Sequence, residues 1–223
     1  KTYSGQGVDD KSVTIHFTLN SLGLYAMILS PDKGITYIDP YTENRKVYKV
    51  YSKKDTKATK SFECLTENQS TKKTVKSYQK NANELKLRTF KLALAATEEY
   101  SNYHVNDAGI GAGSSRNDSI NAVLSAITVT MTRVNAVFER DLGLSMQLVA
   151  NNDQLIFLES DPGVDPYDNN DGTAMLSQNQ ATIDNVIGTA NYHIGHVFST
   201  GGGGVAYLNS PCTGFKAGGV TGY

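Results

Sequence analysis

Apolar and polar residues alternate along the first fifty positions in the manner of β-strands. Residues 13–19 alternate strictly, with Val13, Ile15, Phe17 and Leu19 on one side and Thr14, His16 and Thr18 on the other. A period of two predicts a half-buried strand, with His16 solvated on its polar side. Residues 24–29 and 35–38 flank Pro31-Asp32-Lys33-Gly34, a turn sequence that predicts a hairpin. A further strand is expected near Lys46–Tyr51.

The alternation stops between Lys53 and Glu84. This stretch is mostly Lys, Thr, Ser, Asn, Gln and Glu, with one apolar island at Phe62-Glu63-Cys64-Leu65. So polar a segment buries too little surface to offset its ordering entropy, which predicts an exposed linker open to proteases. No aromatic platform accompanies its lysines, so we interpret them as solvated and expect no nucleic-acid binding.

A different pattern begins after the linker. Leu85–Ala95 alternates as a strand, and apolar residues spaced three and four apart predict a helix over Ser119–Asp141. Asn117 or Asp118 is the expected cap of this helix, and Gly143 follows its end. We then expect a long strand over Met146–Leu158, interrupted or bulged at 151–153, a helix over Met175–Ile187, and three short strands over 193–198, 205–209 and 217–221. The order predicts an α+β (α/β-like) fold with a mixed sheet and helices packed on it.

Composition narrows the function classes. The chain has 223 residues and a formal charge of −1, so no global field recruits nucleic acid or an anionic membrane. No apolar run approaches the roughly 18–20 residues that would span a bilayer. The first residues lack the apolar core of a signal peptide, so any export signal is expected to have been removed or left out of this sequence. Two cysteines, Cys64 and Cys212, leave three readings open: one disulfide, two unrelated thiols, or partners elsewhere.

Three segments suggest chemistry, and each has a simpler interpretation. His193-x-x-His196 has the wrong spacing for two ligands on one side of a strand, and zinc needs a third ligand. Gly201–Gly204 is followed by Val205, not by the Lys-Ser/Thr and helix of a phosphate loop, so it is read as a turn. The acidic loop resembles a calcium loop in composition only, through Asp161, Asp165, Asp168 and Asp171. Calcium is therefore kept as a minor alternative.

Several linked segments resemble one family. GGVAYLNSPC at 203–212, KAGGVTG at 216–222, and the preceding ANNDQLIFLES, NNDGTAMLSQNQATIDNVIG and NYHIGHVFSTGGGG resemble reprolysin-like metzincin zinc metallopeptidases, most of all their secreted bacterial branch. The resemblance covers residues 85–223. It implies a mixed five-stranded twisted sheet with two helices, and assigns 1–80 to a propeptide-like β segment with linker and 81–223 to an incomplete N-terminal catalytic subdomain.

The resemblance also implies what the full-length protein does. Such enzymes carry H-E-x-x-H-x-x-G-x-x-H on a later helix, whose histidines bind zinc and whose glutamate is the general base. No His-Glu pair occurs in these 223 residues. We therefore expect a fragment of a secreted zinc endopeptidase zymogen acting on peptide or protein substrates, itself inactive, with possible self-association through the face that the missing helix would leave uncovered.

Two candidate sites follow from the resemblance. Val205, Ala206, Tyr207 and Leu208 would form an edge strand that pairs with substrate backbone, as in β-augmentation. Cys212 would form a disulfide with a partner outside the chain, and Cys64 would be an inhibitory zinc ligand in the zymogen. The alternatives are a non-enzymatic β-rich surface or binding module that uses an exposed edge strand, and a pseudo-peptidase without the zinc helix.

Overall fold

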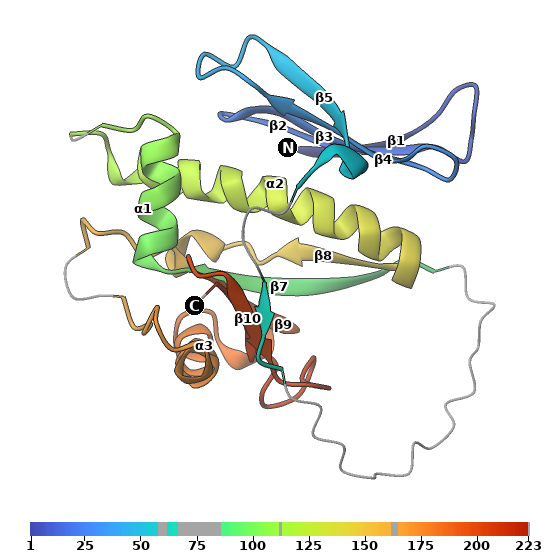
Figure 1. The fold of residues 1–223 in the computed structure, drawn as a ribbon. Helices are drawn as coiled ribbons and strands as arrows, with labels where there is room; N and C mark the ends of the chain where they lie inside the picture. The colour runs from blue at the N-terminus through green and yellow to red at the C-terminus, as the bar shows by residue number, and fades with distance from the viewer. Residues whose placement is uncertain (58–61, 67–85, 112, 162–164, 223) are drawn as a thin grey trace, which may run out of the picture. The chain divides into compact units, whose positions relative to one another are not determined.

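A computed structural model describes residues 1–57, 62–66, 86–111, 113–161 and 165–222 (Figure 1). The chain forms two compact units that interleave in sequence. The first unit comprises Lys1–Ser61, Ala96–Leu142 and Ile156–Asp165, and the second comprises Phe62–Ala95, Gly143–Leu155 and Pro166–Tyr223.

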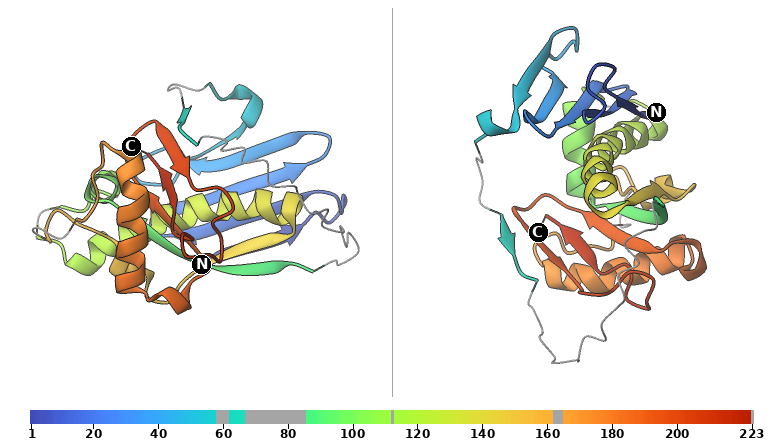
Figure 2. Two further views of the ribbon diagram at one scale, coloured as in Figure 1. Left: turned by 90° about the horizontal axis from the view of Figure 1, so that it is seen from below. Right: turned by 90° about the vertical axis from the view of Figure 1, so that its right-hand side faces the viewer.

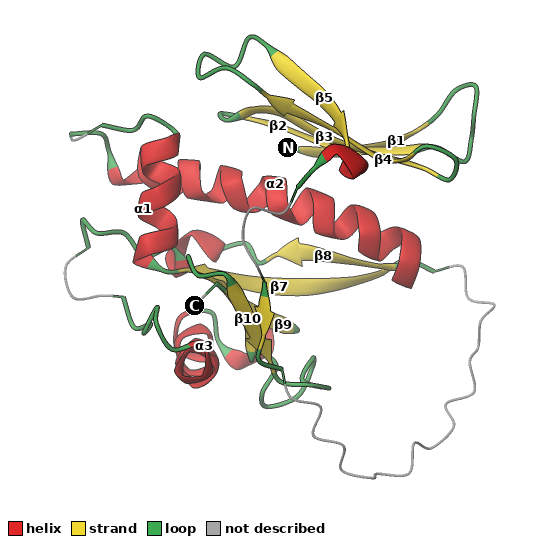
Figure 3. Cartoon of the chain, viewed as in Figure 1, coloured by secondary structure: helices red, strands yellow, loops and turns green. Residues whose placement is uncertain are grey.

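The first unit contains a five-stranded antiparallel sheet in which neighbours in sequence are neighbours in space (Figure 3). The predicted hairpin is confirmed, with Gly34 at φ +75° in its turn. The first strand was missed, because its sequence TYSGQ has no apolar alternation. The five strands are β1 (Thr2–Gln6), β2 (Thr14–Asn20), β3 (Gly23–Ser30), β4 (Gly34–Pro40) and β5 (Tyr48–Ser52).

Two α-helices belong to the same unit, α1 (Glu98–Asp107) and α2 (Arg116–Leu142). Helix α2 packs on β2 and β3, and Ala136 forms a buried cluster with Met27 and Leu29. The predicted helix over Ser119–Asp141 is confirmed, but it starts earlier than expected. Ser115 and Asp118 each accept a hydrogen bond from the other's backbone N–H across the first turn, so Ser115 takes the capping position.

Strand β2 turns its polar side toward α2, contrary to the expected orientation. Asn20 donates to the Ser125 carbonyl, and His16 lies 3.9 Å from Glu139 with its side chain only 13% exposed. His16 is therefore not a solvated side chain. Since side chains alternate along a strand, Ile15, Phe17 and Leu19 point away from α2. The sheet is therefore apolar on both sides, because Met27 and Leu29 of β3 lie on the inner side with His16.

Helix α2 also meets the length and composition of a membrane-spanning helix, which the sequence pattern did not lead us to expect. Half of its most apolar window is buried within the protein. The core helix of a globular protein passes the same test, so this feature is weak evidence for a membrane span.

The second unit is built on a six-stranded mixed sheet with the strand order β6-β10-β11-β9-β7-β8. Helix α3 (Gly172–Val186) packs on β9, β10 and β11 (Figure 2). Gly195 permits this packing, because a Cβ there would lie 2.9 Å from Ile183 Cδ1 of α3 and 2.4 Å from Ala217 Cβ. The strands are β6 (Glu63–Cys64), β7 (Arg88–Ala96), β8 (Leu144–Leu148), β9 (Ile194–Phe198), β10 (Gly203–Ala206) and β11 (Gly219–Thr221).

The long strand expected over Met146–Leu158 is wrong in its second half. Strand β8 ends at Leu148, and a short 3₁₀ helix, η2, covers Asn152–Leu155. The buried Asn152 amide donates to the Leu94 carbonyl and accepts from the Leu94 N–H, both at 2.8 Å. The Asn152 side chain thereby makes the two hydrogen bonds to Leu94 of β7 that the backbone of a longer β8 would have made. The described sheets and helices thus form a mixed α+β structure. Within the described part of residues 81–223 there are five strands, β7–β11, as expected, and three α-helices where two were expected. The sixth strand of the sheet, β6, comes from the linker.

Candidate substrate-binding edge

The residues expected to bind substrate, Val205–Leu208, lie at strand β10 and just beyond it. On one side, β10 pairs with β11 in antiparallel register, with Val205 opposite Val220. Val205 is buried, whereas Tyr207 and Leu208 follow the strand and are 43% and 53% exposed. The Tyr207 N–H donates to the Gly218 carbonyl at 2.9 Å, so this residue stays attached to the sheet.

The other side of β10 carries the short strand β6, which comes from the apolar island of the linker. The two strands run parallel, with Gly203 opposite Glu63 and Gly204 opposite Cys64. The Glu63 N–H donates to the Gly202 carbonyl at 3.2 Å, and the Leu65 N–H donates to the Gly204 carbonyl at 3.0 Å. Within the described residues, β6 and not β10 is therefore the outermost strand here.

Two side chains extend this pairing beyond the backbone. Thr66 Oγ1 accepts a hydrogen bond from the Ala206 N–H at 3.0 Å. The Phe62 ring lies over Gly204, where an added Cβ would come within 2.9 Å of Phe62 Cζ. A larger residue at position 204 would therefore have to displace the ring. We call residues Phe62–Thr66 the edge segment.

The edge segment is held shallowly. Phe62 is 66% exposed, Leu65 is 41% exposed, and Cys64 is an exposed free cysteine. Two backbone hydrogen bonds and one to a side chain each contribute about 0.5–1.5 kcal/mol net. The edge segment is thus held by few contacts. Another extended peptide could offer β10 the same backbone hydrogen bonds.

Glycine also shapes the far end of the candidate edge. A Cβ on Gly218 would lie 2.2 Å from Tyr207 Cδ2, so the Tyr207 ring occupies space that only glycine leaves open. The same ring meets Phe215 edge-on, with centroids 6.1 Å apart. Tyr207 is thus a half-exposed aromatic surface beside the strand, suited to contact an apolar side chain of a bound peptide.

The two histidines of the His193-x-x-His196 motif do not form a metal pair. His193 precedes β9. Its ring Nδ1 accepts a hydrogen bond from the backbone N–H of Lys91 at 3.0 Å, and its backbone N–H donates to the Lys91 carbonyl. His196 lies in β9, and its Nε2 hydrogen-bonds Thr221 Oγ1 at 2.8 Å. Burial lowers the pKa of His196 to about 4, which keeps this imidazole neutral near pH 7. Both side chains join neighbouring strands.

Each described carboxylate of the acidic loop already has a partner. In the first unit, Asp161 pairs with Arg116 at 2.7 Å and Asp165 accepts from the Glu98 N–H at 2.7 Å. In the second unit, Asp168 accepts from the Asn170 N–H, and Asp171 caps α3 by accepting from the N–H groups of Thr173 and Ala174. Residues 162–164 lie outside the described residues. A calcium site is not supported by these contacts and stays an untested expectation.

Cys64 and Cys212 are both free and exposed, so they do not form one disulfide with each other. Cys212 lies in a turn closed by the Thr213 N–H donating to the Ser210 carbonyl at 3.0 Å. Its φ of +62° is a backbone conformation that glycine or asparagine adopts more readily than cysteine. A disulfide from Cys212 to another part of the protein stays a prediction.

The described residues contain no group of three or more His, Cys, Asp or Glu side chains that could hold a metal ion. A zinc site needs at least three protein ligands, so the residues described do not fit the zinc that the resemblance implies.

Sequence reasoning missed the backbone role of the edge segment. The segment was singled out only for its cysteine, although an apolar island in a polar linker is itself a signal for a segment that docks on a sheet. Thr66 was missed altogether, because a single threonine among many in the linker carries no distinguishing pattern.

The second unit thus places α3 on a mixed sheet, with an extended segment of the same chain paired beside β10. Residues 124–223 match the family model for reprolysin-like metallopeptidases of family M12B. The match begins within α2 and includes β8, α3, β9, β10 and β11. No curated protein matches the chain.

Proposed function

We propose that this chain is part of a secreted zinc-dependent endopeptidase precursor, in which β10 and the residues after it bind the substrate backbone. The family match over residues 124–223 supports the peptidase class and its protein substrates. The pairing of an extended segment with β10 is the observation that carries the proposal, because it is the geometry a bound peptide would need.

The edge segment then acts as an internal competitor of substrate. While the Glu63 and Leu65 N–H groups donate to Gly202 and Gly204, these carbonyls are unavailable to another peptide. The segment belongs to the same chain as β10, so its effective concentration is high although its contacts are few. We propose that residues 1–80 are propeptide-like and that this blockage keeps the precursor silent.

The ligands of zinc and the general base are proposed to belong to sequence beyond these 223 residues. Cys64 remains our proposed inhibitory ligand for that zinc, since its thiol is free and exposed in the edge segment. The edge segment would then inhibit the peptidase in two ways. Its backbone would occupy β10, and the thiol of Cys64 would bind the zinc. Cys212 is proposed to pair with a cysteine outside this chain.

Activity of the full-length precursor tests the proposal. We expect hydrolysis of a quenched fluorescent peptide that a zinc chelator abolishes, and no hydrolysis by the 223-residue chain alone. Phe62→Ala should raise the basal activity of the precursor while keeping the thiol, and Cys64→Ala should raise it while keeping the backbone pairing. Tyr103→Ala, at 63% exposure on α1 and outside both the edge segment and β10, is the control.

The outcomes separate the alternatives. If the precursor contains no H-E-x-x-H sequence but still binds extended peptides, the peptidase proposal is refuted. The non-enzymatic binding module would then be the better account. An active precursor whose basal rate is unchanged by Phe62→Ala would refute the blocking role of the edge segment and leave the peptidase class intact.

A further inference from the structure

The outer face of the five-stranded sheet in the first unit carries large apolar side chains and no charge. The strands β1–β5 contain two residues of the Asp, Glu, Lys and Arg types, Asp39 and Lys49, which face each other in the β4–β5 register. Asp39 pairs with Arg133 of α2, so both lie on the inner side. The outer side carries residues such as Phe17, Leu19, Ile28, Ile38, Tyr48 and Val50.

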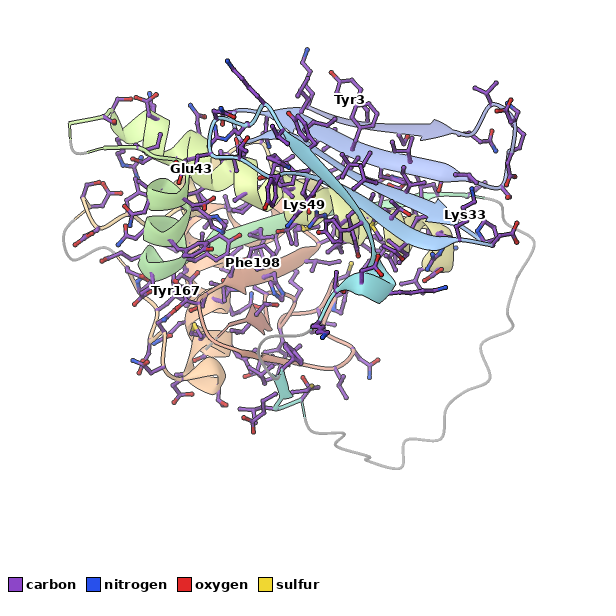
Figure 4. All side chains as sticks on the ribbon, turned by 45° about the horizontal axis from the view of Figure 1, so that its top comes forward. Tyr3, Lys33, Glu43, Lys49, Tyr167 and Phe198 are labelled. Carbon is purple, nitrogen blue, oxygen red and sulfur yellow. The ribbon has the colours of Figure 1, made fainter. Side chains whose placement is uncertain are left out.

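This face is exposed to a degree unusual for such residues. Leu19 is 58% exposed and Val50 is 66% exposed, near opposite margins of the sheet. Tyr3, labelled in Figure 4, is 46% exposed. Its ring stacks on that of Phe17, with the ring centroids 5.0 Å apart. The inner side carries the core of this unit, where Met27 and Leu29 are buried against Ala136 of α2. The outer side is the second apolar side of the sheet, and exposed apolar side chains gathered on one face are typical of a surface that binds a partner.

We propose that this outer face, named here the apolar sheet face, binds a second copy of the chain in a face-to-face dimer. The area fits such a partner. Five strands spaced about 4.8 Å apart and about seven residues long cover roughly 550 Å² in projection. Two copies would bury roughly 1,100 Å², which reaches the roughly 1,000 Å² expected of a specific interface.

The charge distribution favours this occupant over a lipid surface. An uncharged apolar face can pack against the same face of a second copy, because the two faces carry no charges that would repel each other. The two ends of the sheet together carry five acidic and seven basic residues, so the rim is of mixed sign and not the basic cluster that binds anionic lipid headgroups. These residues are Lys1, Asp9, Asp10, Lys11, Asp32, Lys33, Glu43, Arg45, Lys46, Lys53, Lys54 and Asp55. An apolar centre with a polar rim of both signs is the usual composition of a protein–protein interface.

Lysine substitutions on the face test the dimer. The whole 223-residue chain is measured by light scattering and sedimentation over a wide concentration range, and we expect a mass approaching twice 24.2 kDa. Leu19→Lys and Val50→Lys place a charge where the monomer already exposes the side chain, so folding is retained, but the dimer would have to bury it. Each should raise the dimer dissociation constant about tenfold or more.

Leu142→Lys is the control, because Leu142 is 62% exposed at the end of α2 and away from the sheet. Circular dichroism verifies that all variants fold. Monomeric wild-type protein at every concentration would overturn the proposal, as would a dimer that resists both face substitutions or one that Leu142→Lys weakens equally. Wild-type monomers that bind neutral lipid vesicles through the face would assign it to a membrane instead and would also overturn the dimer.

Discussion

Truncating Phe62 to alanine measures how firmly the edge segment holds β10. Phe62 is 66% exposed, so about one third of the surface of this residue is buried when the edge segment is docked. A phenylalanine has roughly 200 Å² to bury, so about 70 Å² is at stake, worth about 1.7 kcal/mol at about 25 cal/mol per Å². Alanine keeps a small part of this contact. We therefore expect Phe62→Ala to favour release of the segment by about 1.5 kcal/mol, or roughly tenfold.

Native-state hydrogen exchange reads this release directly. The Glu63 and Leu65 amides, which donate to Gly202 and Gly204, should exchange about tenfold faster in Phe62→Ala. The Tyr207 amide, bonded to the Gly218 carbonyl, should be unaffected and serves as the internal reference. Tyr103→Ala, on α1, should leave all three rates as in the wild type. Equal rates at Glu63 and Leu65 in Phe62→Ala and Tyr103→Ala would refute the inferred contact with Gly204.

Three further predictions concern stability. Asp171→Ala removes the cap that accepts from the Thr173 and Ala174 N–H groups, so it should cost about 1 kcal/mol and lower the melting temperature by about 2–4 °C, and an unchanged melting curve would count against the cap. His196 has a native pKa lowered to about 4, so its contribution to stability is present above its unfolded pKa near 6.5 and is lost as the pH falls toward 4; urea midpoints should show this loss, and His196→Gln should reduce it. Burial, and then the 2.6 Å hydrogen bond to Asp39, raise the pKa of Tyr51 to about 12, so stability present below pH 10 should be lost as the pH rises toward 12; if Tyr51→Phe shows the same alkaline loss, Tyr51 is not its source.

Periodicity in the sequence located the long elements because each had enough apolar residues to define a face. It recovered β2, the β3–β4 hairpin, α2 and α3, and it missed α1. Helix α1 has the sequence EEYSNYHVND, whose few apolar residues define no stripe. Its signals are local instead: Thr97 accepts from the Tyr100 N–H as the cap, and Glu98 and Glu99 follow in the first turn.

The errors in strand length and facing have a tertiary cause. Alternation in β2 identified two sides correctly but could not say which one would meet α2, because that depends on residues such as Ser125 and Glu139, more than a hundred positions away. The early end of β8 depends on Asn152, whose amide replaces a strand partner for Leu94. The strand pairing of Cys64 with Gly204 was beyond local pattern for the same reason.

The pairing of β6 with β10 also has a consequence in time. The Ala206 N–H reaches Thr66 across 140 positions of the chain, so the ribosome completes the edge segment well before its docking strand exists. At roughly 5–20 residues per second, that interval is about 7–28 s. Contacts of such long sequence separation form late in folding, because loop closure must be paid before they contribute. We therefore expect β6 to be the last strand to join its sheet, although it is synthesised first. Once the sheet has formed, β10 is paired with the edge segment from the start.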